Sequence, residues 1–437
     1  MHQSLCLQSR VPSYAVAVVS VFITKVRIAK RFLVAVLVLV ALTTVPGTPT
    51  HARVLASGVD GWGMPGHDVS GTRFNPAATT LSVSMIRSLH PVWTLPILTG
   101  PSPVVIGNLV FVPAFRAASG SKGVDVLDAR TGKRIRRFSM TALHLPPGDV
   151  LSVLACARGI VVLGDTGDPY AHPVHPPALV GIDAKVGRRL WRVSIASTWL
   201  AIAGRTVYTG FDTSAAIDLL TGRVLWRHTG RYGSPLVLAG HLYQARRDGD
   251  SATTSIYDPR TGELVQTIAN LPNTTWIGNS RHAFADHLQF GGQSWLASMT
   301  LSGQTSWKVD LGPIESTPLP ALAYDTLFVA SQRPWPGVLA MRASDGRVLW
   351  KAAIGPNVAL AAAGRLIFAL HRIGPRSDPN LDTRVDVLEA GSGRLLRRIN
   401  LSTYLQQHDL MSGLSDLAIA ADTLYLFSYQ GVVALRP

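Results

Sequence analysis

The chain has 437 residues, of which 47% are hydrophobic and only 15% are charged, and its formal charge is +15. A typical soluble domain has about 25% charged residues, so this composition excludes a disordered chain. The 39 glycines and 28 prolines interrupt the chain too often for a helical bundle. Only two cysteines are present, Cys6 and Cys156, which excludes a disulfide framework and a four-cysteine zinc site.

The N-terminus has the three parts of a secretory signal. A basic stretch, KVRIAKR at 25–31, precedes an apolar run of 11 residues, FLVAVLVLVAL at 32–42, and small residues lead up to Ala52. A membrane-spanning helix needs about 20 apolar residues, so this run is too short to be one. We predict that residues 1–52 are a signal peptide cleaved after Ala52 and that the protein is extracytoplasmic. An uncleaved N-terminal membrane anchor is the alternative.

The positive charge is spread along the chain. Residues 1–52 hold five basic residues and no acidic one, so the remaining chain carries +10. Its basic residues are scattered, whereas a nucleic-acid-binding protein shows a basic stripe with a reading motif. We therefore predict that the protein does not bind nucleic acid.

After a lead-in segment, residues 53–88, one unit recurs through residues 89–437. Each unit begins with two apolar strands separated by a turn, as in SPVVIGNLVFV at 102–112, and ends with two strands around a tight glycine turn. The clearest turn is AIDLLTGRVLW at 216–226, with its tryptophan at position 11. The turn glycines are Gly132, Gly187, Gly222, Gly262, Gly303, Gly346 and Gly393.

The last unit is incomplete, and the N-terminal end of the repeat region supplies what it lacks. Residues 417–437 provide three strands but no turn or tryptophan, while LHPVWT at 89–94 provides a fourth strand with Trp93. Eight units between Trp93 and Pro437 average about 43 residues, which is the length of a propeller blade. The sequence therefore predicts an all-β fold: an eight-bladed β-propeller of four-stranded antiparallel blades, the last blade closed by the N-terminal strand.

These units resemble the repeat of the pyrroloquinoline quinone (PQQ)-type propeller family, the quinoprotein alcohol dehydrogenase-like fold. The segment WGMPGHDVSGTRFNP at 62–76 also resembles the leader that precedes the first blade in that family. The resemblance implies that each repeat tryptophan docks on the turn glycine of a neighbouring blade, a structural role. The tryptophans concerned are Trp93, Trp191, Trp226, Trp307 and Trp350.

The enzymes of this family use PQQ with calcium, held by Glu, Asn and Asp, and several have a disulfide between adjacent cysteines. This chain has no adjacent cysteines, and Glu315 is its one glutamate expected to face the channel, because Glu263 and Glu389 belong to turns. His172 and His175 have no identifiable further metal ligands. We therefore predict no catalytic residues, no metal and no cofactor. A PQQ-dependent sugar or alcohol dehydrogenase, with PQQ and calcium, is the alternative.

The channel end where the inner strands begin is the remaining candidate surface, because aromatic and amide side chains often line ligand pockets. We predict that the protein is a monomeric, non-catalytic binding module for a protein, peptide or glycan. The candidate ligand-binding residues are Trp199, Tyr232, Asn273, Trp276, Glu315, Asn357 and Asp416.

Overall fold

The computed structural model describes most of the chain beyond residue 60. The described ranges are 61–96, 104–116, 121–145, 151–165, 176–248, 251–268, 274–279, 283–287, 293–300, 303–313, 319–331, 336–373, 382–410, 414–428 and 430–437. The chain divides into two units, Met1–Val54 and Leu55–Pro437, and all described residues belong to the second. The predicted signal peptide and the pair His172 and His175 lie outside the described residues, so these interpretations stay predictions.

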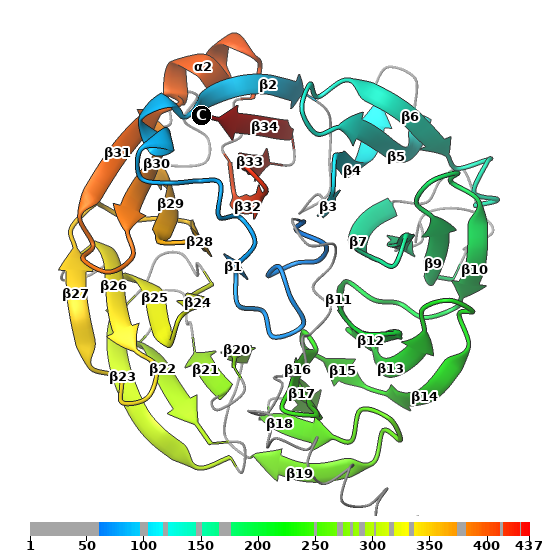
Figure 1. The fold of residues 1–437 in the computed structure, drawn as a ribbon. Coiled ribbons are helices and arrows are strands. Elements are labelled where there is room, and N and C mark those ends of the chain that lie inside the picture. The colour runs from blue at the N-terminus through cyan, green and yellow to red at the C-terminus, as the bar shows by residue number, and fades with distance from the viewer. Residues whose placement is uncertain are drawn as a thin grey trace, which may run out of the picture. The chain divides into compact units, whose positions relative to one another are not determined.

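Eight sheets, each built on four antiparallel strands, surround a central channel as the blades of a propeller (Figure 1). The middle strands of a blade pack against neighbouring blades on both faces, which is why their sequences are almost continuously apolar. Every residue of β8 (Ile160–Asp165) and of β13 (Thr213–Asp218) is buried. The structure confirms the predicted all-β, eight-bladed propeller.

The strands follow one another from the channel outward in chain order. Blade 1 consists of β3 (Val104–Ile106), β4 (Leu109–Arg116), β5 (Ser121–Asp128) and β6 (Arg134–Ser139). Blade 2 consists of β7 (Leu151–Ala157), β8, β9 (Ala178–Asp183) and β10 (Arg189–Val193). Blade 3 consists of β11 (Trp199–Ala203), β12 (Thr206–Gly210), β13 and β14 (Val224–Thr229). Blade 4 has a divided inner strand, β15 (Arg231–Tyr232) and β16 (Leu236–Leu238), followed by β17 (His241–Asp248), β18 (Ser251–Tyr257) and β19 (Leu264–Ile268).

The second half of the ring repeats this order. Blades 5 and 6 consist of β20 (Thr274–Gly278), β21 (Ala283–His287), β22 (Gln293–Met299) and β23 (Thr305–Pro313); and β24 (Ala321–Ala323), β25 (Thr326–Ser331), β26 (Gly337–Arg342) and β27 (Val348–Ala352). Blade 7 contains β28 (Ala359–Ala363), β29 (Leu366–Ile373), β30 (Asp382–Glu389) and β31 (Leu395–Asn400), and β1 (Phe74–Asn75) adds to its inner edge in parallel.

Blade 8 is assembled from both ends of the propeller sequence. Its three inner strands are β32 (Asp416–Ala420), β33 (Thr423–Ser428) and β34 (Gly431–Arg436), and β2 (His90–Pro96) is the outer strand. Trp93 of β2 is paired with Ala434 of β34, and Figure 1 shows the blue β2 beside the red β34. Main-chain hydrogen bonds thus close the ring as predicted, so neither end of the repeat is left unpaired.

Two short helical segments were not expected from the sequence. These are a 3-10 turn, η1 (Met85–Ser88), and a helix, α2 (Ser402–Gln407), which connects blades 7 and 8 and buries Leu405. A segment of six residues is too short for a helical repeat of apolar residues to be visible.

The tight turn between the third and fourth strands needs both its aspartate and its glycine. In blade 3, the Asp218 carboxylate accepts main-chain hydrogen bonds from Leu220 and Thr221, at 3.1 and 2.9 Å. Gly222 has φ +72°, a conformation that costs glycine little. Partial burial raises the pKa of Asp218, but hydrogen bonds from Arg205 and Thr221 outweigh it and lower the pKa to about 2.

Five tryptophans make the same contact with the turn of the next blade. Each indole Nε1 donates to a main-chain carbonyl three residues before the turn glycine, over 2.8–3.0 Å. Each ring lies so close to the glycine that an added Cβ would be only 2.4–2.7 Å from it. The pairs are Trp93 on Gly132, Trp191 on Gly222, Trp226 on Gly262, Trp307 on Gly346 and Trp350 on Gly393.

Where a copy lacks tryptophan, another side chain fills the place. Phe138, two residues after Arg136, covers Gly187, and Ile268, two residues after Gln266, covers Gly303. Residues two apart in a strand face the same side, which allows this substitution. The third such copy has Arg397, which donates to the carbonyls of Arg87 and Leu89 at the seam with blade 8.

Candidate functional site

The lead-in residues 61–75, here called the strap, run through the middle of the ring as the blue trace in Figure 1. Main-chain hydrogen bonds join the strap to the inner strands of six blades, and the Asn75 side chain donates to a seventh. The partners are Val105, Cys156, Val237, Gly278, Leu322, Ala362 and Ile419. Within the described chain, blade 3 is the exception, since Met64 reaches its hydrophobic core by side-chain packing alone.

These partners fall in the middle or the later part of their strands. The strap therefore occupies the end of the channel where the tight turns lie, here called the turn end. The opposite end, where the inner strands begin, is here called the mouth.

One strap side chain reaches toward the mouth. Arg73 is buried, with 4% of its surface exposed, and has φ +50°. Its Nε donates to the Leu360 carbonyl over 2.6 Å, and its Nη2 forms an ion pair with Asp416, the first residue of β32. The carboxylate predicted to bind a ligand is thus held by an arginine of the same chain.

The other predicted ligand-binding residues are in contrasting environments. Asn357 is fully buried and donates through Nδ2 to the Gly337 carbonyl over 2.9 Å. Tyr232 is also buried, and burial raises the pKa of its hydroxyl to about 12. Asn273 and Glu315 lie outside the described residues, as does the side chain of Trp276 in β20. The structure therefore does not gather the described members into one pocket.

Among the candidate residues that the structure describes, Trp199 is the most exposed, and it has an unexpected partner. Trp199 is 45% exposed and Phe211 is 40% exposed, and their ring centroids are 6.1 Å apart at an angle of 66°. Phe211 has φ +142°, which is unusual for a residue with a side chain and costs about 1–3 kcal/mol. Sequence reasoning missed Phe211, because a lone aromatic after a strand is a weak signal.

A buried polar network supports this aromatic pair. The Ser197 hydroxyl donates to the carbonyls of Trp199 and Gly210, at 2.7 and 3.1 Å. In blade 4 the buried Gln244 donates through Nε2 to the Thr209 carbonyl over 2.9 Å and accepts from the Ser214 hydroxyl. Because these groups are buried and mutually satisfied, they fix the ends of β11 and β12 relative to blade 4.

A second buried polar cluster lies inside blade 7. Asp386 accepts from Arg398 at 2.7 and 2.9 Å and faces His371 Nε2 at 3.3 Å, and both His371 and Asp386 are fully buried. Burial raises the pKa of Asp386, but the bonds from His371 and Arg398 lower it further than burial raises it. Arg398 is partly exposed, but the His371 and Asp386 side chains that it covers have no access to solvent, so this pair stabilises the blade and does not meet a substrate.

The described residues do not fit the calcium and PQQ that the family resemblance implies. Calcium requires six to eight oxygen ligands, and no group of three or more His, Cys, Asp or Glu that could hold a metal occurs among the described residues. Asp416 faces the guanidinium of Arg73, a cation that would repel a metal ion. The thiol among the described residues, Cys156, is buried, and burial raises its pKa to about 12, so it is not a nucleophile.

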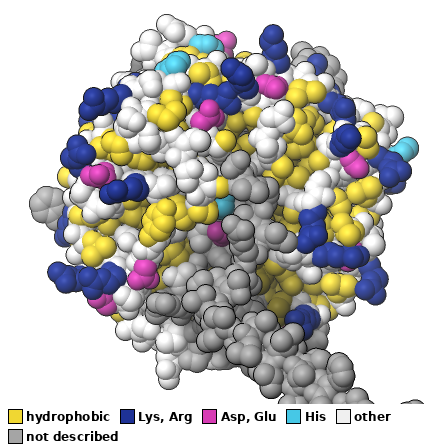
Figure 2. Space-filling model, viewed as in Figure 1, with side chains coloured by type: hydrophobic (Ala, Val, Ile, Leu, Met, Phe, Trp, Pro, Cys, Tyr) yellow, Lys and Arg dark blue, Asp and Glu magenta, His cyan; other side chains and the backbone are white. Residues whose placement is uncertain are grey.

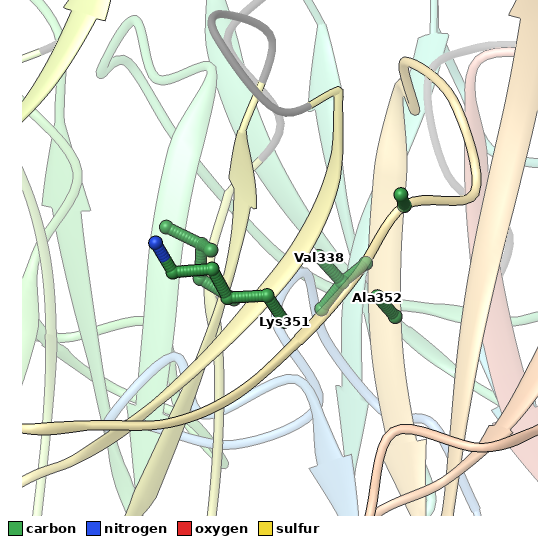
Figure 3. Close-up of a pocket in the computed structure, with 5 residues that line it drawn as sticks. Val338, Lys351 and Ala352 are labelled. Atoms are coloured by element: carbon green, nitrogen blue, oxygen red, sulfur yellow. The ribbon is translucent and has the colours of Figure 1, made fainter.

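A pocket of about 210 Å³ lies at the outer strands of blade 6 (Figure 3). The residues that line it are Val338, Leu339, Lys351, Ala352 and Ala353. The lining is apolar apart from Lys351, whose side chain extends away from Ala352 in the close-up. A single amine provides no acid–base pair, so this pocket is not a candidate catalytic site.

On the face shown in Figure 2, Lys and Arg side chains are spread around the margin, with hydrophobic and uncharged atoms between them, so the described part of this face shows no continuous basic patch. Among the residues that the structure describes, no helix is long and apolar enough to cross a membrane.

Comparison with known proteins supports the fold. None of the curated proteins matches the sequence. BamB from Moraxella catarrhalis has a similar structure, with a TM-score of 0.55 and 18% identity over 80% of this chain and 100% of that chain. Quinohemoprotein alcohol dehydrogenase from Comamonas testosteroni has a TM-score of 0.60 and 13% identity, over 88% of this chain and 81% of that chain.

A europium-containing methanol dehydrogenase is similar too, with a TM-score of 0.57 and 12% identity, over 85% of this chain and 90% of that chain. Identities this low establish the fold alone. The family model described as outer membrane protein assembly factor BamB matches residues 177–296 and 292–437, more than half of the chain. The chain therefore belongs to this BamB-like family of PQQ-type propellers.

Proposed function

We propose that this chain is an exported, monomeric and non-catalytic propeller that binds a protein or peptide outside the cytoplasm. The observation that carries the proposal is the Arg73–Asp416 ion pair, through which the strap engages the carboxylate at the mouth. Polar groups that an enzyme would need are used here for internal contacts, as with Asn357 and Asp386. Membership of a family described as an assembly factor favours a protein partner over a glycan.

A cofactor titration tests the non-catalytic part of the proposal. The full chain is incubated with PQQ and calcium chloride, excess PQQ is removed by gel filtration, and retained quinone is measured by absorbance. Dye reduction is then assayed with alcohols and sugars, beside a quinoprotein dehydrogenase reconstituted in the same way as the control. We expect no retained PQQ and no turnover. Stoichiometric PQQ with turnover would overturn the proposal in favour of a PQQ-dependent dehydrogenase.

The location and the state of the N-terminus need a separate measurement. Cells that express the chain with a C-terminal tag are fractionated, and the purified protein is examined by mass spectrometry and light scattering. We expect an extracytoplasmic monomer that begins after Ala52. A protein recovered from the cytoplasm would contradict the proposal, whereas an intact, membrane-bound N-terminus would replace the signal peptide with an anchor.

A further inference from the structure

The junction of blades 3 and 4 at the mouth presents an accessible aromatic pair, Trp199 and Phe211. Exposed aromatic side chains contribute little to folding, but they are enriched at the centres of protein interfaces, where they bury large apolar areas. A ring pair at 66° leaves an angled apolar surface that a single inserted side chain can contact from two sides.

The backbone holds Phe211 in place at a cost. Its φ of +142° suits glycine, yet the residue is phenylalanine. The Phe211 carbonyl accepts from the Tyr232 amide over 2.6 Å, and the Asp212 carbonyl accepts from the Gly230 amide over 3.2 Å. Blade 4 therefore maintains the conformation that presents this ring, and strain of this kind is concentrated at functional sites.

An arginine lies beside the aromatic pair on the blade 4 side. Arg246 of β17 is the cross-strand partner of Tyr232, so its side chain lies on the same face of the sheet as Tyr232, whereas Arg231, the residue before Tyr232 in β15, points to the opposite face; both arginines are exposed. Figure 1 shows β15 beside β12 and β13, consistent with the hydrogen bond between Phe211 and Tyr232. Within the described chain neither guanidinium has a hydrogen bond or an ion pair, and the exposed acid closest in sequence to Phe211 is Asp212.

We propose that this surface, consisting of Trp199, Phe211 and Arg246, binds an acidic segment of a partner protein that carries an aromatic side chain. The aromatic side chain packs into the angle against both rings, and a flanking carboxylate pairs with the guanidinium of Arg246. Arginine favours such pairing because its planar fork matches a carboxylate. A neutral glycan would stack on Trp199 but would leave Arg246 without a partner. The inference rests on the proposed function and names the site and partner chemistry for it.

The test uses the full chain and short fluorescein-labelled peptides. One probe has a central phenylalanine flanked by aspartates and glutamates; the second replaces the acids by lysines, and the third replaces the phenylalanine by alanine. Fluorescence anisotropy gives the Kd for wild type, Trp199→Ala, Phe211→Ala and Arg246→Glu. Arg223→Glu, an exposed arginine of blade 3 at the turn end, is the matched control.

We expect the acidic aromatic peptide to bind wild type and the other two probes to bind at least about tenfold more weakly. Each of the three variants should weaken binding by about tenfold or more, and Arg223→Glu should not. Affinity should fall as salt rises, because the Debye length is about 10 Å at 0.1 M and shorter above it. Near-ultraviolet circular dichroism checks that the variants are folded.

Two results would overturn the site. One is equal binding of the acidic and the basic peptide, and the other is an unchanged Kd in Trp199→Ala and Arg246→Glu. Failure of wild type to bind the acidic peptide also rejects this site, but it leaves the non-catalytic propeller standing. Turnover with PQQ, measured independently, rejects the proposed function whatever the peptide result.

Discussion

At the turn end of the ring, five tryptophans make one and the same contact; at the mouth, the side chains of blades 3 and 8 have quite different surroundings. Trp191 and Trp226 cover turn glycines with nearly the same geometry. By contrast, blade 3 presents Trp199 to solvent, whereas Asp416 of blade 8 pairs with the strap. The difference indicates that the repeated contact serves the packing of one blade on the next, whereas the residues at the mouth are not constrained by that packing.

The strongest test of the turn end is Gly222→Ala. A Cβ there would lie 2.6 Å from Trp191, in addition to the cost of positive φ, so we expect a loss of about 2–5 kcal/mol in the free energy of unfolding. Urea denaturation followed by tryptophan fluorescence measures it.

Gly204→Ala in the same blade is the matched control for this substitution. Gly204 has φ +61° but no atom within 4 Å of an added Cβ, so its loss should be only about 1–2 kcal/mol. Equal losses for the two variants would show that tryptophan docking does not constrain the turn glycine.

The strap links the two ends of the channel, and Arg73→Ala tests how much that link contributes. Removing two hydrogen bonds, one of them to a carboxylate, should cost about 2–3 kcal/mol. The exposed Arg231→Ala serves as a control and should change stability by less than about 0.5 kcal/mol. Equal urea midpoints for Arg73→Ala and wild type would mean that the Arg73 contacts of the strap do not stabilise the fold.

The aspartate of the tight turn predicts a pH dependence with a definite sign. The pKa of Asp218 falls from 3.8 to about 2 on folding, so its stabilising effect is full above about pH 4 and disappears as the pH falls toward 2. Asp218→Asn should therefore lower the thermal midpoint at pH 7 by an amount that shrinks toward zero near pH 2. A difference that stays constant over this range would refute the assignment. Asp212→Asn, an exposed aspartate outside the turn, is the control.

The smallest expected effect concerns the mouth and has the opposite sign. Phe211→Gly removes an exposed ring and relieves the positive φ, so the variant should be as stable as wild type or more stable by up to about 1 kcal/mol. Phe211→Ala keeps the strain and is the comparison, with both measured by urea denaturation. If Phe211→Gly were less stable than Phe211→Ala, the backbone conformation of residue 211 would not be strained, and the argument that strain presents the Phe211 ring would fail.

The repeat, the number of blades and the closure by Trp93 could all be predicted from the sequence, because each depends on a local pattern of strands and turns. The copies that lack tryptophan also depend on a local pattern, since Phe138 takes the place of the missing tryptophan two residues further along the strand. The site was predicted only in part. Trp199 is accessible, but Asn357 and Tyr232 are buried, since position at the start of an inner strand does not fix the direction of a side chain.

By itself, the sequence determined the architecture of this protein, because turn glycines, alternating strands and tryptophans act over distances of one blade. Only the tertiary structure decided how residues far apart in the chain meet at the channel. Arg73 and Asp416 form an ion pair although most of the sequence of the ring lies between them. Phe211 depends on a neighbouring blade for its conformation. Such contacts arise from closure of the ring, which places the first described residues against inner strands from all around the channel, and no local sequence pattern predicts them.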